Sequence, residues 1–195
     1  MAKEFVSLIR YPGITAETLK VIDEIERGPP PEIVHFREFL KEKGFGLSTP
    51  GKLLSSWEGP VPGDTFTQPT TKPNLPDSKA LLGIAEVVFL IFGQDTLGLY
   101  LVLHWDFFLT DMEIRQAVLA LCRSMIVRFG GTDCILTSDF SPIWTAFRNG
   151  ISFEEAIRCA GPEHPEVSTI DELYIRCVFD GHETWDSRGY WRMPL

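Results

Sequence analysis

The stretch LLGIAEVVFLIFGQDTLGLYLVLHWDFFL, residues 81–109, is the most apolar part of the chain and decides its fold. A membrane-spanning helix needs about 20 mostly apolar residues in one run. Glu86 falls early in this stretch and GQDT at 93–96 breaks its middle, so each half is too short to span a membrane as a helix. Both halves are rich in aliphatic and aromatic residues, and turn residues separate them. The sequence therefore predicts an antiparallel hairpin with strands at 84–92 and 98–106.

The first predicted strand is apolar on both faces. Alternate side chains point to opposite sides of a strand, which places Val88, Leu90 and Phe92 on one face and Val87, Phe89 and Ile91 on the other. A strand buried on both faces lies inside a sheet that is covered above and below. We therefore expect the hairpin to form the centre of the core, with Leu101 and Leu103 buried beside Val88 and Leu90.

Shorter patterns fill the rest of the chain. They predict strands at 4–11, 133–139 and 173–181, and helices at 15–27, 32–43, 110–131, 141–150 and 152–161. Thr15 and Ser141 are expected caps, and Thr110 with Glu113 and Ser152 with Glu155 form predicted capping boxes. Strands and helices are mixed without a βαβ rhythm. This favours a single α+β domain over residues 1–195, with a mostly antiparallel sheet.

Two segments stand apart from these elements. Residues 44–79 are rich in proline and glycine and predict a long surface loop or an arm that wraps the domain. The tail at 182–195 is aromatic and irregular. The four scattered cysteines predict reduced thiols, and the start MAKEFVSLIRYPG has no secretory cleavage pattern. We therefore expect a cytoplasmic protein, outside membranes.

The charge is strongly acidic and unevenly distributed. The net charge is -9, and residues 61–195 carry 10 basic against 18 acidic side chains, which accounts for -8 of it. This sign disfavours contact with the phosphates of nucleic acids. It favours encounter with a basic partner protein, and it also keeps a protein soluble without any partner.

One group of residues has the composition of a general acid–base site. On the predicted strand at 98–106, His104 and Asp106 share a face, and Glu86 lies opposite His104 if the turn has an odd number of residues. A carboxylate beside an imidazole is the material of a general base. A hydrogen-bonded polar pair that satisfies a buried histidine explains the same residues, and no nucleophile motif accompanies them. The sequence thus leans against an enzyme, with a small hydrolase as the alternative.

Cofactor and metal signals are weak. Cys159, His164, Cys177 and His182 are zinc-binding residue types, but their spacing lacks the close pairs of structural zinc sites. No glycine-rich nucleotide loop is present. We therefore expect neither a metal nor a cofactor.

The C-terminal third carries the residue types of protein interfaces. Aromatic and arginine side chains are enriched at binding hot spots, and here they are Trp185, Arg188, Tyr190 and Trp191. Carboxylates that would steer a basic partner are Glu163, Glu166, Asp171 and Glu172. The tail can equally pack back on its own domain.

Small acidic α+β proteins with few catalytic groups have the character of inhibitor, antitoxin and immunity proteins, an analogy without a motif. The leading hypothesis is a protein-binding protein that neutralises a toxin or basic enzyme. A hydrolase and an accessory or oligomer subunit are the alternatives, and the oligomeric state is left open.

Overall fold

The computed structural model describes residues 4–45, 80–84, 87–179 and 185–194. Apart from Gly44 and Phe45, the proline-rich segment predicted at 44–79 therefore lies outside the described residues.

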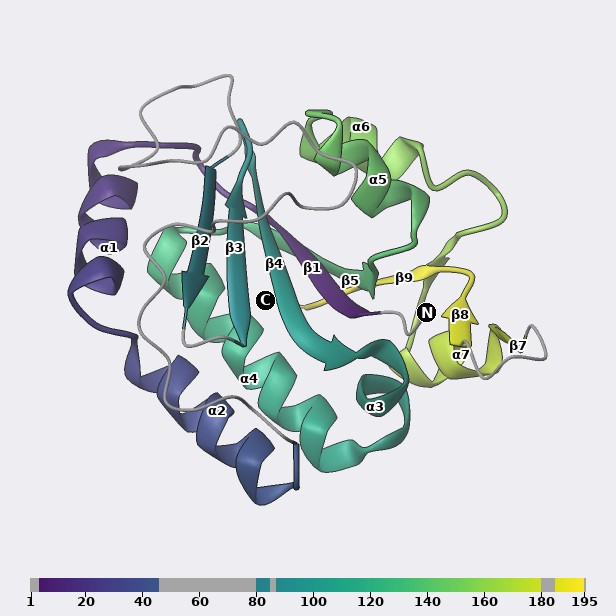
Figure 1. Cartoon of the computed structure of the whole chain (residues 1–195). Helices are drawn as coiled ribbons and strands as arrows, with labels where there is room; N and C mark the ends of the chain where they lie inside the picture. Colours follow the sequence, from purple (N-terminus) through teal and green to yellow (C-terminus); the bar gives the residue numbers. More distant parts are fainter. Residues whose placement is uncertain (1–3, 46–79, 85–86, 180–184, 195) are drawn as a thin grey trace.

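A seven-stranded sheet organises the chain (Figure 1), in the order β2-β3-β4-β1-β5-β9-β6. All neighbouring strands pair antiparallel except β6 and β9, which are parallel. A separate antiparallel pair is formed by β7 and β8. The fold is thus α+β with a mostly antiparallel sheet, as the sequence predicts. The strands are β1 (Glu4–Arg10), β2 (Ala80–Ile84), β3 (Val88–Phe92), β4 (Thr96–His104), β5 (Asp133–Ser138), β6 (Glu166–Val167), β7 (Cys177–Phe179), β8 (Trp185–Ser187) and β9 (Tyr190–Arg192).

Helices cover the two faces of the sheet unequally. α1, α2, α3 and α4 pack on one face, and α5 and α6 pack on the other (Figure 1). No helix among the described residues is both long and apolar enough to cross a membrane. The helices are α1 (Ala16–Arg27), α2 (Pro31–Glu42), α3 (Trp105–Thr110), α4 (Met112–Phe129), α5 (Pro142–Arg148), α6 (Phe153–Arg158) and α7 (Ile170–Ile175).

The hairpin predicted from the apolar stretch is confirmed as the β3–β4 pair, with two corrections to its bounds. Residues 84–92 do not form one strand, because β2 ends at Ile84 and pairs antiparallel with β3. β4 ends at His104, and Trp105 already belongs to α3. The turn is made by residues 93–95, where the Gly93 amide donates to the Thr96 carbonyl at 2.8 Å.

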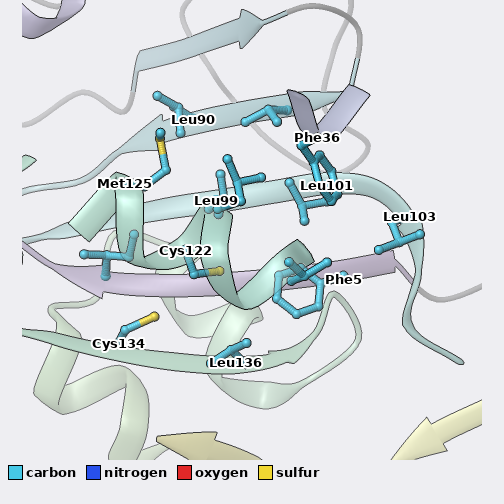
Figure 2. Packing of buried hydrophobic residues seen from close by; sticks show 14 of the residues in the cluster. Phe5, Phe36, Leu90, Leu99, Leu101, Leu103, Cys122, Met125, Cys134 and Leu136 are labelled. Carbon is cyan, nitrogen blue, oxygen red and sulfur yellow. The ribbon is translucent and has the colours of Figure 1, made fainter. Parts of the chain in front are cut away.

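The larger core lies between the sheet and α4 (Figure 2). Leu90, Leu99 and Leu101 project from β3 and β4 toward Cys122 and Met125 of α4. The four residues expected to be buried at the hairpin are at most 1% exposed, namely Val88, Leu90, Leu101 and Leu103. Both faces of β3 are thus covered by other parts of the chain. This is the physical reason why its sequence is a continuous apolar run.

The smaller core lies on the other face, under α5 and α6. Trp144 and Phe147 of α5 are almost fully buried there and approach the backbone of β4 at Gly98. Ser141 caps α5 as predicted, accepting a hydrogen bond from the Trp144 amide at 3.1 Å. The carboxylate of Asp95, in the β3–β4 turn, accepts from the Phe153 amide at 3.0 Å and so ties α6 to the hairpin.

The predicted start of the long helix is wrong for a traceable reason. Thr110 does not cap the long helix, because it belongs to α3. Asp111 caps α4 instead, and its Oδ1 accepts from the amides of Glu113 at 2.9 Å and Ile114 at 3.0 Å. Aspartate and threonine are both good caps, and two adjacent candidates left the choice to the tertiary structure.

The strand predicted at 173–181 is wrong in its first half. Residues up to Ile175 belong to α7, and only Cys177–Phe179 form β7. Thr169 accepts from the Glu172 amide at 3.2 Å, and Glu172 accepts from the Ser168 amide at 2.6 Å. A threonine with a glutamate three residues later is a capping signal, and here it outweighs the β-propensity of the apolar residues that follow.

Candidate functional site

A cleft of about 520 Å³ opens at the end of β4, where the chain turns into α3 beside the C-terminal end of α2. Two carboxylates, one imidazole and one ammonium group meet two aromatic rings there. The lining residues are Glu4, Lys43, Gly44, Phe45, Val102, Leu103, His104, Phe107, Asp111 and Ile114.

The aromatic wall of the cleft depends on how α3 is anchored. Trp105 is fully buried, and its ring lies 5.2 Å from that of Phe108 and 5.7 Å from that of Phe5, between centroids. This anchoring leaves Phe107, which lies between the two buried positions, 37% exposed. The ring of Phe107 stacks on His104 at 5.7 Å and 23°, and Phe45 meets it edge-on at 5.1 Å.

Strand pairing brings Glu4 to His104. The two residues are partners across β1 and β4, next to a register shift between Glu4 and Val6. His104 Nε2 lies 3.8 Å from Glu4 Oε1. That separation is an ion-pair distance and exceeds the length of a hydrogen bond.

The carboxylate of Glu4 is poorly solvated. Its side chain is 19% exposed, and Oε2 is buried and accepts no hydrogen bond from the part of the chain that the structure describes. Burial raises the pKa of Glu4, and nearby Asp139 and Asp106 raise it further, whereas His104 and a hydrogen bond from the Leu103 amide lower it. When ionised, Glu4 thus carries a charge that water screens weakly.

The opposite rim of the cleft holds an internal ion pair. Lys43 Nζ lies 2.5 Å from Glu113 Oε2 and 3.6 Å from Asp111 Oδ2. The hydrogen bond with Glu113 raises the pKa of Lys43. Amide donors of α4, that of Ile114 first, lower the pKa of Asp111. The ammonium group of this lining residue is therefore already engaged by two carboxylates.

The catalytic set suggested by the sequence is not assembled as predicted. Asp106 lies in the first turn of α3, so it does not share a strand face with His104. The reason is that β4 ends two residues earlier than its apolar pattern suggests. Glu86 lies outside the described residues. Glu4 is the carboxylate paired with His104, a contact between residues 100 positions apart that only strand pairing reveals.

The aromatic residues of the tail contribute to the sheet. Tyr190 is buried, and its hydroxyl donates to Glu166 Oε2 at 3.2 Å. Burial, with Glu166 nearby, raises the pKa of Tyr190 to about 12. Trp191 is partly buried against the larger core and is the partner of Leu136 on β5. Trp185 lies on β8, and its side chain is outside the described part.

The carboxylates proposed to steer a partner mostly face arginines of the same chain. Glu163 lies 3.5 Å from Arg188, measured between Oε2 and Nη1. Asp171 Oδ1 lies 2.9 Å from Arg115 Nη1, and Glu166 Oε2 lies 3.9 Å from Arg192 Nε. Glu172 accepts from the Ser168 amide at the start of α7. Their negative charge is thus partly compensated locally.

The possible zinc set lies only partly within the described residues. Cys159 is an exposed free thiol, whereas the side chain of Cys177 and the whole of His182 lie outside. No group of three or more potential ligands is close enough to hold a metal within the described residues.

Comparison with protein-family models, with curated proteins and with solved structures finds no match for this chain. Function is therefore inferred from the chemistry of its own residues.

Proposed function

We propose that this chain is a non-enzymatic protein-binding protein that recognises a basic partner, in the manner of an inhibitor or immunity protein. The observation that carries the proposal is the acidic cleft at the end of β4. Glu4 and Asp111 line it, Asp106 acts electrostatically on Glu4, and Glu113 shares Lys43 with Asp111. Two carboxylates thus line the cleft and two more act on its charged groups, against one lysine among the described lining residues.

The charge of the whole chain supports the same partner class. A net charge of -9 accelerates encounter with a basic protein and repels an acidic one. The cleft concentrates this effect, because low-dielectric walls focus the field of nearby charges. Around the cleft, Asp111 and Glu113 share one lysine, whereas on the C-terminal surface Glu163, Glu166 and Asp171 each face an arginine of their own.

The partner can be identified by purifying the tagged chain from its native host and analysing the co-purified proteins by mass spectrometry. Stopped-flow kinetics with the purified partner then tests the mechanism. We expect the association rate to fall steeply as salt rises, while dissociation changes less. Glu113→Gln should slow association. The matched control Glu163→Gln removes an equally exposed carboxylate on the C-terminal surface and should have the smaller effect. An association rate independent of salt would contradict the proposal.

The pairing of Glu4 with His104 in the cleft favours one alternative, a hydrolase-like enzyme that uses general acid–base chemistry. Stoichiometry separates the two functions. A binding protein neutralises its partner one to one, whereas an enzyme acts at a small fraction of that amount. If the chain acts substoichiometrically and folded His104→Ala loses this activity, the enzyme replaces the binding protein.

A further inference from the structure

We propose that the cleft at the end of β4 is a subsite for an arginine side chain of the partner. The proposal rests on the proposed function and adds which chemical group is recognised and where. It follows from the apolar wall, the desolvated carboxylate and the position of the internal lysine.

The wall suits the flat guanidinium group and its aliphatic stem. Phe107 is 37% exposed and Val102 is 43% exposed, so both present apolar surface to an incoming side chain. Arginine buries its methylene stem along such surface and stacks its planar head on aromatic rings. The rings of His104 and Phe107 stack on each other, 5.7 Å apart at 23°, so a planar group can stack on an outer face of this pair.

Glu4 supplies the anion. Its carboxylate is largely removed from water, and Asp106 and Asp139 add negative potential around it. A weakly screened carboxylate gains more from a cation than a solvated one does, because attraction strengthens as the local dielectric falls. Guanidinium stays protonated and carries five donors in a fixed plane, which matches a carboxylate better than the point charge of lysine.

Lys43 explains why the incoming cation belongs on the Glu4 side. Its ammonium group is held at the other rim by Glu113 and Asp111, so these two carboxylates already have a cation of their own chain. Within the described residues, the cationic partner of Glu4 is His104, at 3.8 Å, and the Leu103 amide also donates a hydrogen bond to its carboxylate. A cation that enters the cleft therefore gains most by binding beside Glu4.

The test titrates the full-length, ¹⁵N-labelled chain with three blocked tripeptides, Ac-Gly-Xaa-Gly-NH₂, in which Xaa is arginine, lysine or citrulline. Citrulline has the shape of arginine without its charge. We expect saturable shifts of the amides at 43–45 and 102–107 with the arginine peptide, several-fold weaker binding of the lysine peptide, and no saturation with citrulline.

Two variants and a control locate the site. Glu4→Gln removes the charge, and Val102→Lys places a tethered cation at the mouth of the cleft. Each should weaken binding of the arginine peptide at least about tenfold, as expected for loss of a charged hydrogen-bonding partner. Glu163→Gln should leave the affinity unchanged. If Glu4→Gln alters the fold, Val102→Lys at an exposed position still decides.

Several results would overturn the subsite. They are equal binding of the arginine and citrulline peptides, equal binding of arginine and lysine, shifts centred away from the cleft, or affinity unchanged in Val102→Lys. The proposed function fails separately. If a basic partner binds in a salt-sensitive way but also binds Val102→Lys normally, the subsite is wrong and the proposed function stands. If the arginine peptide binds specifically but no basic partner protein exists, the proposed function is wrong and the subsite stands.

Discussion

Substituting Gly98 by alanine is the sharpest test of how α5 packs on the sheet. An added Cβ would lie 2.5 Å from Cε1 of Phe147 and 3.1 Å from Cζ3 of Trp144. Both rings are at most 2% exposed, so neither can swing into solvent. Overpacking of this kind costs about 1–3 kcal/mol, and removal of a strand glycine returns about 0.5–1 kcal/mol. We expect a net loss of about 1–2 kcal/mol in the free energy of unfolding.

Gly28→Ala is the matched control, because Gly28 has extended backbone with φ 177° and nothing lies within 4 Å of the added Cβ. It should change stability by less than about 0.5 kcal/mol. Urea denaturation followed by tryptophan fluorescence measures both variants. Phe147→Leu should relieve the clash, so the double variant Gly98→Ala with Phe147→Leu should be more stable than additivity predicts. If Gly98→Ala is as neutral as Gly28→Ala, or if the two substitutions are additive, the described packing of α5 is refuted.

Three further outcomes follow from the described contacts. Leu101→Ala, at a fully buried position of β4, should lower the free energy of unfolding by about 2–5 kcal/mol in chemical denaturation; a loss below about 1 kcal/mol would contradict a buried hairpin. Asp111→Ala should lower the free energy of unfolding by about 0.5–2 kcal/mol through loss of the α4 cap, and Thr110→Ala should lower it by less. A larger loss with Thr110→Ala would instead identify Thr110 as the cap. Burial raises the pKa of Glu4 in the folded state, so the ionised carboxylate lowers the free energy of unfolding. This destabilisation is absent below the ordinary glutamate pKa and complete above the folded-state pKa. Stability of the wild type relative to Glu4→Gln should therefore fall as pH rises through that window, and parallel pH profiles in urea titrations would show that Glu4 is not desolvated.

The parts of the fold that local pattern predicts are those where one signal dominates. The β3–β4 hairpin combines apolar strands with a turn at 93–95, and Ser141 followed by Pro142 marks the start of α5. The errors occur where two signals compete. At α7, the Thr169 cap and the apolar residues after it favour different structures. Likewise, the single strand predicted at 84–92 contains the change of direction between β2 and β3.

The cleft illustrates what local pattern cannot supply. Glu4 and His104 meet because β1 lies between β4 and β5, and no periodicity within either strand specifies that order. The sequence points to His104 from its own neighbourhood, whereas the carboxylate paired with it lies near the start of the chain. The prediction that Asp106 shares a strand face with His104 is wrong because the strand ends at His104. The residue type and local sequence point to His104, but only the strand order shows that Glu4 is paired with it.

Glu4 also connects stability to recognition. A carboxylate with a buried oxygen that accepts no described hydrogen bond, near Asp106 and Asp139, opposes folding when it is ionised. Glutamine keeps the shape of the side chain and removes the charge, so Glu4→Gln should raise the free energy of unfolding at neutral pH. If the charge serves an arginine of the partner, the same substitution should weaken binding. A variant that is more stable and binds less tightly would assign the charge to recognition. A variant that is more stable and binds equally well would leave Glu4 without a role in the cleft.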